Sequence, residues 1–461
     1  MKRTLTLAAM LAILALFGCD QKPATSAGNA PAAPAAAPAV NTPTPPGVTE
    51  ITWWHSMDGA LETWVNDLAK DFNAKNPQYR VVPVYKGEYN EALTIAIAAF
   101  RAGKAPDILQ VFEVGTATMM AAKGAIKPVG ALMKEQGKAF DPKSFIPAVA
   151  SYYTAPDGQM LSMPFNSSTT VFYYNKDAFK KAGLDPEKAP RTWPEVERAA
   201  QKLKAAGEKC PLTTTWMTWV QLESFSTWHN VNYSTYNNGF DNTAATRLLA
   251  NSPLHVRHFE NLEKWNKQGL FQYKGRAGKG LASFTSGECD MIMGSSGSYA
   301  NIKRDSKFSW GISELPYYPD VKGAPHNTII GGASLWVMSG KSPEEYKGVA
   351  NFFEYLSDPK VQSESHKRTG YLPITTEAYK LTEASGFYKA NPGTDVAVNQ
   401  MVRKVTVKSR GIRIGNYSQV RTIFDEETEN IWAGKKSAKQ ALDAAVQRGN
   451  QELAKFEAAN K

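Results

Sequence analysis

Few residues in this chain form the patterns that covalent or metal chemistry requires. The sequence has no HExxH zinc motif, no Walker A phosphate loop and no CxxC pair. The run 294–297, GSSG, lacks the GxSxG spacing that exposes a nucleophilic serine. His255 and His258 are three residues apart on a predicted helix, where we expect a surface pair rather than metal ligands. We therefore predict that the chain is not an enzyme and needs no catalytic residue, metal or cofactor.

What the chain offers instead is a set of polar, aromatic and small residues where predicted strands lead into loops. Ligands of open α/β sheets bind beyond the carboxyl ends of strands, so these residues are binding candidates. The stretch 161–179 is the clearest case, because small polar residues at 166–170 lead into the aromatic strand 171–174. We expect it to cross between two lobes with its polar start facing a cleft.

The elements that must position these residues alternate between strand and helix patterns. Strands are predicted over 48–54, 79–85 and 107–112, with amphipathic helices between them. This order indicates a largely parallel sheet covered by helices, and therefore an α/β protein. Thr192 and Glu195 form a capping box that opens a later helix.

The N-terminal residues indicate export. Residues 1–18 combine Lys2 and Arg3 with an apolar run too short to span a bilayer, which predicts a cleaved signal peptide. The ending Leu-Phe-Gly-Cys19 resembles a bacterial lipobox, with a lipidated cysteine, although an ordinary secretory signal with an incidental Cys19 is the alternative. The Ala/Pro-rich remainder of 19–48 predicts a tether without a packed core. We expect a periplasmic protein tethered to the inner membrane.

Composition and charge limit the remaining functions. The chain has 461 residues, of which 43% are hydrophobic, enough for two lobes. The formal net charge of +10 is spread along the chain without a long basic block, so we predict a solvated surface and no nucleic-acid binding. Cys210 and Cys289 each lie near a predicted strand start. They either pair in an oxidising compartment or remain buried free thiols.

Several motifs resemble one known family. The runs 165–186, FNSSTTVFYYNKDAFKKAGLDP, and 191–203, RTWPEVERAAQKL, resemble the extracellular solute-binding proteins of ABC importers of the maltose-binding type. The runs 110–121, QVFEVGTATMMA, and 329–338, IIGGASLWVM, are similar to the glycerol-phosphate-binding branch of that family. The resemblance extends from about residue 49 to the C-terminus. The lipobox and tether depart from the usual soluble form.

The resemblance implies a two-lobed periplasmic-binding-protein fold of type II. Each lobe should be a mostly parallel sheet flanked by helices, with several crossings between lobes. One lobe should comprise 49–164 and 305–340, and the other 165–304 and 341–461. The implied ligand is sn-glycerol-3-phosphate, with glycerophosphocholine as a further candidate, and the implied partners are the permease subunits of an importer. We expect a monomer that closes on its ligand.

The resemblance also implies a set of ligand contacts. Arg421 would bind the phosphate through its guanidinium fork, its alternative being a surface salt bridge with Asp425 or Glu426. Glu113 would accept hydrogen bonds from the glycerol hydroxyls, or otherwise stabilise a helix N-terminus. The full set is Tyr89, Glu113, Ser168, Trp216, Trp219, Ser295, Gly332, Tyr371 and Arg421.

The other contacts each have a chemical role and a structural alternative. Tyr89, Tyr371 and Ser168 would donate hydroxyl hydrogens, and Ser295 would belong to an anion-binding turn rather than a plain one. Gly332 would allow close backbone approach or mark a β-bulge. The indoles at 216 and 219 would cover the glycerol carbons and attract a quaternary ammonium, or else pack in the core.

Two other functions remain as alternatives. A sugar-binding protein of the same fold would depend on aromatic stacking, and Arg421 would then be incidental. A periplasmic phosphodiesterase would need a metal cluster or an activated nucleophile, and the sequence contains neither pattern.

Overall fold

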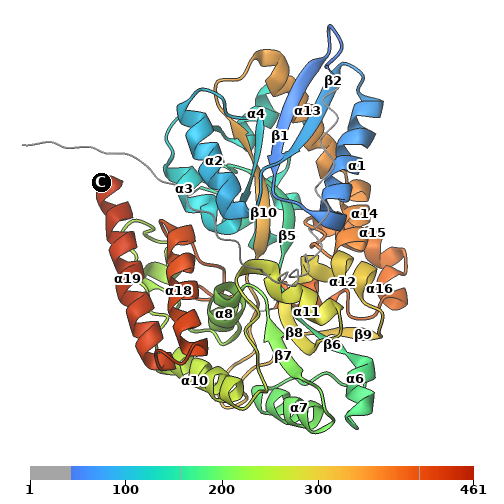
Figure 1. Cartoon of the computed structure of the whole chain (residues 1–461). Helices are drawn as coiled ribbons and strands as arrows, with labels where there is room; N and C mark the ends of the chain where they lie inside the picture. The colour runs from blue at the N-terminus through green and yellow to red at the C-terminus, as the bar shows by residue number, and fades with distance from the viewer. Residues whose placement is uncertain (1–42, 156, 404, 461) are drawn as a thin grey trace, which may run out of the picture. The chain divides into compact units, whose positions relative to one another are not determined.

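Two β-sheets organise the described part of the chain, residues 43–155, 157–403 and 405–460, in this computed structural model (Figure 1). The predicted signal peptide, Cys19 and the tether up to residue 42 lie outside these residues. The first sheet has the order β2-β1-β3-β10-β4, with β5 also paired to β10, and the second has the order β7-β8-β6-β9. The strands are β1 (Thr49–His55), β2 (Tyr79–Tyr85), β3 (Ile108–Phe112), β4 (Ile126–Lys127), β5 (Met163–Ser168), β6 (Thr170–Asn175), β7 (Cys210–Thr214), β8 (Cys289–Ser295), β9 (Trp310–Ser313) and β10 (Gly331–Met338).

Helices flank both sheets. In Figure 1, α1 and α14 lie to the right of the first sheet and α2 and α3 to its left. The helices are α1 (Gly59–Lys75), α2 (Tyr89–Arg101), α3 (Thr116–Ala121), α4 (Val129–Glu135), α5 (Pro147–Tyr152), α6 (Lys176–Lys181), α7 (Trp193–Ala205), α8 (Phe225–Trp228), α9 (Thr235–Asn238), α10 (Pro253–Lys267), α11 (Leu281–Thr285), α12 (Tyr299–Asp305), α13 (Pro343–Ser357), α14 (Pro359–Thr369), α15 (Thr376–Ala384), α16 (Phe387–Ala390), α17 (Val396–Met401), α18 (Tyr417–Trp432) and α19 (Ala438–Ala459). Short turns at the site are η1 (Glu113–Gly115), the π-helix η3 (Trp219–Ser224), η4 (Ala277–Gly280) and η5 (Ser296–Ser298).

The prediction of mostly parallel sheets is wrong in detail, because both sheets are mixed. Strand β1 pairs parallel with β2 and β3, and β7 pairs parallel with β8. Strand β10 is antiparallel to β3, β4 and β5, and β6 is antiparallel to β8 and β9. The antiparallel pairs arise because β5, β6 and β10 lie next to the points where the chain passes from one sheet to the other. Local βα patterns do not reveal the direction of such strands.

The predicted crossover strand is confirmed. Strand β5 pairs with β10 in the first sheet, and β6 pairs with β8 in the second, so the chain changes sheets at Thr169. All five residues from Asn166 to Thr170 are buried. Several of their polar groups find partners across the junction: Thr169 donates to the carbonyl oxygen of Ile329 at 2.7 Å, and Gln400 donates to that of Thr170 at 2.8 Å.

Two segments pack with a different sheet from the one expected. Strand β9 lies within 305–340 but pairs with β6 of the second sheet, so the chain returns to the first sheet only after Ser313. Helix α13 lies within 341–461 but packs on β1 of the first sheet. Its buried face includes Val349, Phe352 and Phe353, which join the same apolar cluster as Ile51.

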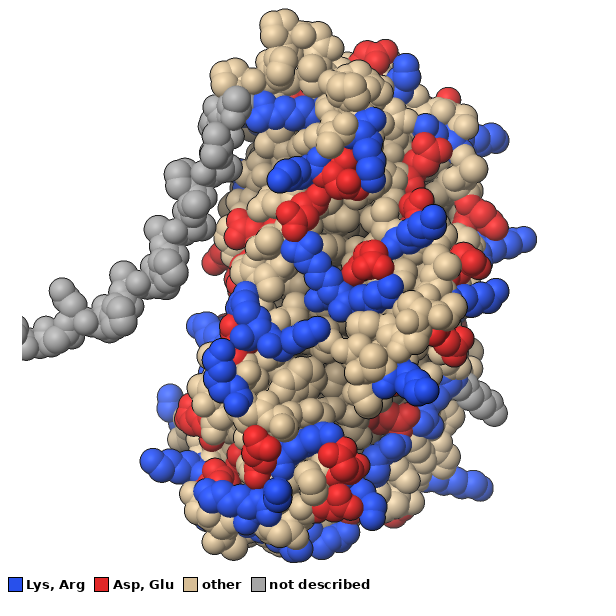
Figure 2. Space-filling model, turned by 90° about the vertical axis from the view of Figure 1, so that its right-hand side faces the viewer, with Lys and Arg blue, Asp and Glu red and all other residues tan. Residues whose placement is uncertain are grey.

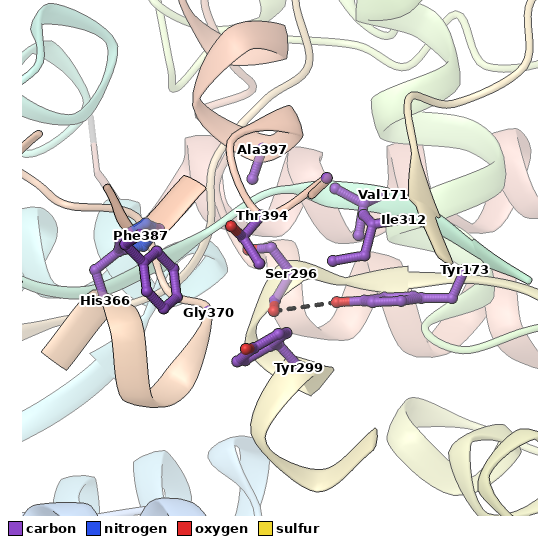
Figure 3. A pocket seen from close by; sticks show the side chains of 11 residues that line it. Val171, Tyr173, Ser296, Tyr299, Ile312, His366, Gly370, Phe387, Thr394 and Ala397 are labelled. Atoms are coloured by element: carbon purple, nitrogen blue, oxygen red, sulfur yellow. Dashed lines mark hydrogen bonds between the residues drawn. The ribbon is translucent and has the colours of Figure 1, made fainter. Parts of the chain in front are cut away.

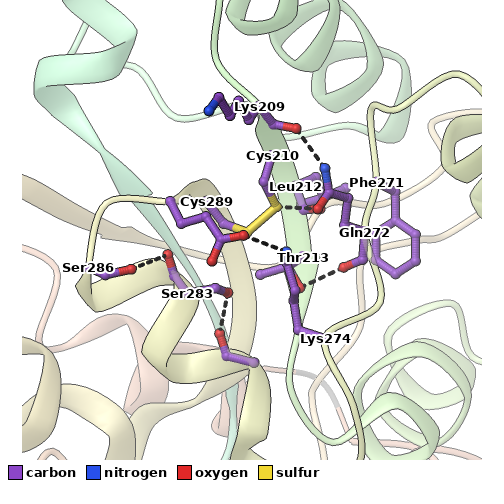
Figure 4. Close-up of a disulfide and its surroundings, with 12 residues drawn as sticks. Lys209, Cys210, Leu212, Thr213, Phe271, Gln272, Lys274, Ser283, Ser286 and Cys289 are labelled. Carbon is purple, nitrogen blue, oxygen red and sulfur yellow. Dashed lines mark hydrogen bonds and ion pairs between the residues drawn. A yellow bond between two sulfur atoms is a disulfide. The ribbon is translucent and has the colours of Figure 1, made fainter. Parts of the chain in front are cut away.

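The two non-terminal cysteines form a disulfide, one of the two alternatives that the sequence left open. Cys210 begins β7 and Cys289 begins β8, and the two residues are directly paired in register. Their sulfur atoms lie 2.04 Å apart, and the bond joins adjacent strands of the second sheet (Figure 4).

The histidine pair on α10 is buried, so the prediction of a surface pair is wrong. His255 contacts the hydroxyl groups of Ser226 and Ser252 at 2.7 Å, and His258 contacts the side-chain oxygen of Gln221 at 3.0 Å. The face of α10 that carries both histidines packs into the protein, because it also carries large apolar residues.

Charged residues of both signs cover the surface seen in Figure 2. On this face Lys and Arg side chains are interspersed with Asp and Glu, which agrees with a net charge that is spread along the chain.

The capping box of α7 is also present, with Thr192 accepting from the Glu195 N–H and the Glu195 side chain accepting from the Thr192 N–H.

Candidate functional site

All nine residues of the predicted ligand set line one cavity of about 400 Å³. They come from both sheets and from segments that are far apart in the sequence. Glu113 follows β3 of the first sheet, Ser295 ends β8 of the second, and Ser168 stands at the crossover between them. The fold therefore gathers at one place residues that the sequence distributes over more than 300 positions.

The charged centre of the cavity is a buried cluster of Glu113, Glu223 and Arg421. Arg421 donates through Nε and Nη2 to the two carboxylate oxygens of Glu223, at 2.8 and 2.5 Å. Its Nη2 also donates to Glu113 at 2.6 Å. The side chains are 11% exposed for Arg421, 6% for Glu113 and 0% for Glu223. One guanidinium is thus held between two carboxylates in a site that water barely reaches.

The pKa values of this cluster reflect burial and mutual charge. Burial raises the pKa of Glu113, and this effect outweighs the lowering by Arg421. For Arg421, burial lowers the pKa, but the two carboxylates more than compensate and raise it well above its usual value. Arg421 is therefore firmly cationic, whereas a further negative charge beside Glu113 would raise its pKa still more.

The alternative partners expected for Arg421 are engaged elsewhere. Asp425 accepts a hydrogen bond from Thr218 Oγ1 at 2.7 Å, and Glu426 pairs with Arg448 on α19. Helix α18 points Arg421 toward η1 and η3, and away from its own surface neighbours. A sequence pattern of i and i+4 charges could not show this, because Glu223 is 198 positions away.

Two tyrosines that line the cavity, Tyr89 and Tyr371, offer phenol groups. The ring of Tyr89 stacks on Phe112 with centroids 5.2 Å apart, and its hydroxyl accepts from Asn166 Nδ2 at 3.0 Å. Burial raises the pKa of Tyr371 to about 12 and that of Tyr89 well above its usual value. Both phenols therefore keep their protons and can donate one hydrogen bond each to a ligand.

The turn that carries Ser295 is fixed by hydrogen bonds from a buried tyrosine on the side away from the cavity. The Tyr173 hydroxyl donates to the carbonyl oxygen of Ser296 at 3.2 Å (Figure 3) and to that of Ser295 at 3.1 Å. The cavity drawn in Figure 3 measures about 10 Å³, room for one water at most. Packing behind the turn thus leaves no room for a ligand on that side of Ser295, whose other side lines the 400 Å³ cavity.

The same turn does not offer the free N–H groups that an anion nest would need. The Ser296 N–H donates to the carbonyl oxygen of Thr169 at 2.8 Å, and the Gly297 N–H donates to Ser295 Oγ at 3.1 Å. The hydroxyl group of Ser295 therefore remains as the donor that this turn can offer to a ligand. Gly297 is needed for packing, since a Cβ there would lie 2.6 Å from the ring of Tyr371.

The tryptophans and Gly332 form the remaining wall. Trp219 is buried in the core and packs on Gly331, while Trp216 is half-buried with a backbone φ of +46°. The N–H of Trp216 donates to the carbonyl oxygen of Ala277 at 2.8 Å, which holds this strained residue in place. At Gly332, where φ is +80°, a Cβ would lie 1.9 Å from the carbonyl oxygen of Asn166. Only glycine fits there, and a β-bulge follows at the next residue pair.

The structure adds residues that the sequence did not single out, one buried behind the cavity and two in its wall. Glu223 lies in the apolar run Val220-Gln221-Leu222-Glu223, where an isolated charge is itself a signal of a buried ion pair. The glycine-rich loop 275–280, GRAGKG, contributes Arg276 and Lys279. Arg276 pairs with Glu429 at 2.8 and 2.6 Å.

Two classes of feature are absent from the described residues. No group of three or more His, Cys, Asp or Glu side chains in 43–155, 157–403 and 405–460 is placed to hold a metal ion. None of the helices in these same ranges combines the length and the apolar character needed to cross a membrane.

Comparison with known proteins gives a consistent result. A model of the family described as bacterial extracellular solute-binding protein matches residues 67–395. The sn-glycerol-3-phosphate-binding periplasmic protein UgpB of Salmonella paratyphi A is 54% identical over 416 residues, covering 90% of this chain and 94% of that protein. UgpB of Escherichia coli K12 is 53% identical with the same coverage.

Solved structures agree at the level of the fold. The crystal structure of UgpB from Mycobacterium tuberculosis in complex with glycerophosphocholine has a TM-score of 0.74 and 21% identity, covering 89% of this chain and 99% of that one. The maltose-bound MalE3 of T. maritima has a TM-score of 0.73 and 17% identity, covering 87% and 99%.

Proposed function

Because this chain belongs to the bacterial extracellular solute-binding protein family, we propose that it captures sn-glycerol-3-phosphate or a glycerophosphodiester and delivers it to an ABC importer. The family resemblance and the periplasmic-binding-protein fold, both predicted from the sequence, are confirmed. The chain is a solute-binding protein rather than an enzyme. Its ligand, site residues and partners are inferred from the cavity and from its relatives.

One observation carries the proposal. A buried guanidinium, two phenols and the hydroxyls of Ser168 and Ser295 line a single cavity between segments of both sheets. Arg421 provides the charge-assisted donors that a phosphate needs, and the neutral donors surround it. In two relatives more than 50% identical over 90% of this chain, the names state binding of sn-glycerol-3-phosphate.

The size and the aromatic wall of the cavity suit a small polar ester. A volume of about 400 Å³ lies within the range of small-ligand sites. Trp216 and Trp219 cover the side on which the glycerol carbons would lie, and the half-buried Trp216 is accessible to a ligand cation. Glycerophosphocholine, the ligand named for the M. tuberculosis structure, carries such a cation.

Delivery depends on closure of the two sheets around the ligand. Ser168 and Gly332 stand at the paired strands β5 and β10, next to the crossover. A ligand held between Glu113 and Ser295 therefore bridges elements of both sheets and stabilises the closed population. That population is the form that permease subunits would recognise. A periplasmic monomer, tethered through Cys19, is the arrangement we infer from the sequence.

Calorimetric titration of the purified protein tests the ligand class. We expect saturable binding of sn-glycerol-3-phosphate and of glycerophosphocholine. We expect no binding of maltose. Maltose binding without phosphate-ester binding would support the sugar-binding alternative and contradict the proposal. Arg421→Lys keeps the charge but loses the two-point fork, so it should weaken both phosphate esters while the protein stays folded.

A further inference from the structure

The buried cluster of Glu113, Glu223 and Arg421 carries an excess negative charge. Two carboxylates share one guanidinium, and all three side chains are at most 11% exposed. The proposed ligand adds at least one further negative charge beside the same guanidinium. A buried site cannot readily hold three negative charges against one positive charge, because burial limits their screening by water.

The hydrogen bonds assign different roles to the two glutamates. Glu223 occupies both Nε and Nη2 of Arg421, a two-point pair that fixes the plane of the guanidinium. Glu113 accepts a single bond from Nη2. Nη1 makes no hydrogen bond to any described residue, so it is the donor still available to a ligand. Glu113 can therefore give up its single hydrogen bond from Arg421 when a ligand binds, whereas Glu223 keeps Arg421 in position.

The surroundings of Glu113 favour its neutral form once a ligand arrives. The groups that face it are Tyr89 from α2, Tyr152 and Tyr153 at the end of α5, Glu223 from η3 and Arg421 from α18. Arg421 is the one cation among these five groups. Burial and the neighbouring Glu223 already raise the pKa of Glu113, and a phosphate on Arg421 acts in the same direction.

We propose that capture of the phosphate ester is coupled to the uptake of one proton by Glu113, while Glu223 acts as the positioning residue that keeps Arg421 in place. The proton comes from solvent and converts the Glu113 carboxylate to a carboxylic acid. The neutral acid then donates its O–H to the ligand. This inference rests on the proposed function, since it assumes that the ligand carries a phosphate group.

Calorimetry with glycerophosphocholine tests the coupling. Its phosphodiester does not titrate near neutral pH, unlike a phosphate monoester with a second pKa of about 6, so any proton taken up belongs to the protein. Titrations at pH 7.5 in buffers of different ionisation enthalpy should give a binding enthalpy that changes linearly with that enthalpy. We expect a slope that corresponds to uptake of close to one proton per ligand. The affinity should then fall by up to about tenfold per pH unit above neutrality.

Variants separate the two glutamates. Glu113→Gln imitates the protonated acid, so its binding enthalpy should not depend on the buffer and its affinity should not depend on pH. Glu223→Gln should lower the affinity by about tenfold at every pH, because an amide has only one acceptor oxygen for the two guanidinium N–H donors that Glu223 accepts from. If Glu223 were only structural, the variant would melt earlier with an unchanged affinity.

Glu427→Gln is the matched control. Glu427 lies on α18, is similarly buried, and pairs with Lys436 and Arg448 away from the cavity. Its replacement should reduce stability while leaving affinity and proton uptake as in the unmodified protein.

The outcomes distinguish a failure of the proton coupling from a failure of the proposed function. Binding of glycerophosphocholine with the same enthalpy in every buffer overturns proton coupling and leaves the proposed function standing. A buffer dependence that persists in a binding-competent Glu113→Gln variant overturns the assignment to Glu113. If that variant does not bind, the slope and the pH dependence of the unmodified protein decide whether binding is coupled to proton uptake. Absence of binding for both glycerophosphocholine and sn-glycerol-3-phosphate overturns the proposed function together with this inference.

Discussion

Arg421 and Arg276 both line the cavity, and each donates through Nε and Nη2 to a glutamate. The difference lies in their surroundings. Arg421 is 11% exposed and meets a second carboxylate, whereas Arg276 and its partner Glu429 are 40% and 33% exposed. Water screens the rim pair of Arg276 and Glu429, so this pair contributes little, while removing Arg421 from the buried cluster leaves two carboxylates uncompensated.

The comparison suggests that the centre and the rim of one cavity have different roles in ligand binding. The buried cluster presents fixed charge to the part common to all proposed ligands, the phosphate. The rim, made of Trp216 and the loop 275–280, is more exposed and, in the proposed complex, would contact the group that the phosphate bears. Changes in the cluster should therefore affect all ligands strongly, and changes at the rim should affect some ligands weakly.

The largest effect is expected for Arg421→Ala. This variant leaves Glu113 and Glu223 without their cation, so the free energy of unfolding should fall by about 3–5 kcal/mol. Affinity for sn-glycerol-3-phosphate should fall on the order of 100-fold, as for the loss of a charge-assisted bond of about 3 kcal/mol. Chemical denaturation and calorimetric titration measure the two effects. A folded variant with unchanged affinity would show that the cluster does not contact the ligand.

A second effect concerns Asp425, one turn after Arg421. Burial raises the pKa of Asp425 to about 6, so the folded state favours its protonated form. This contribution to stability is complete below pH 3.8 and is lost as the pH rises through about 6. It amounts to about 3 kcal/mol at about 1.4 kcal/mol per pKa unit.

Asp425→Asn should remove this part of the pH dependence. Urea denaturation at pH 4 and pH 7 should give a smaller difference for the variant than for the unmodified protein. Asp443→Asn is the control, because Asp443 lies on α19 in an exposed pair with Lys439. Equal differences in all three proteins would mean that Asp425 is as well solvated as the rim.

At the rim, Trp216→Ala should discriminate between ligands. Loss of a cation–π contact costs about 0.5–2 kcal/mol, so affinity for glycerophosphocholine should fall by about 2- to 30-fold. Affinity for sn-glycerol-3-phosphate, which has no ammonium group, should fall less. Parallel titrations measure the ratio. Equal losses for the two ligands would assign Trp216 a packing role only.

The smallest effect is expected for Arg276→Ala. An exposed pair contributes about 0.2–1 kcal/mol, so stability should change by no more than this and affinity by less than about fivefold. The same titration and denaturation as for Arg421→Ala provide the comparison. A loss as large as that of Arg421→Ala would mean that burial does not explain the difference between the two arginines.

The sequence by itself determined the local elements and the composition of the site. The amphipathic pattern between 48–54 and 79–85 predicted a helix, which is α1 with Leu61, Trp64 and Leu68 buried, and the polar run before Val171 predicted the crossover. These features depend on the periodicity of neighbouring residues, which a sequence displays directly. The nine site residues came from motif resemblance, and each of them lines the cavity.

Only the tertiary structure decided which of these residues are partners. Nothing near Arg421 in the sequence indicates Glu223, and nothing near His255 indicates that its helix face is covered. The antiparallel direction of β10 and the pairing of β9 within the second sheet depend on strand pairings between distant segments. Burial and long-range pairing are properties of the packed chain, and they determine whether a charged residue is screened at the rim or desolvated at the centre of the cavity.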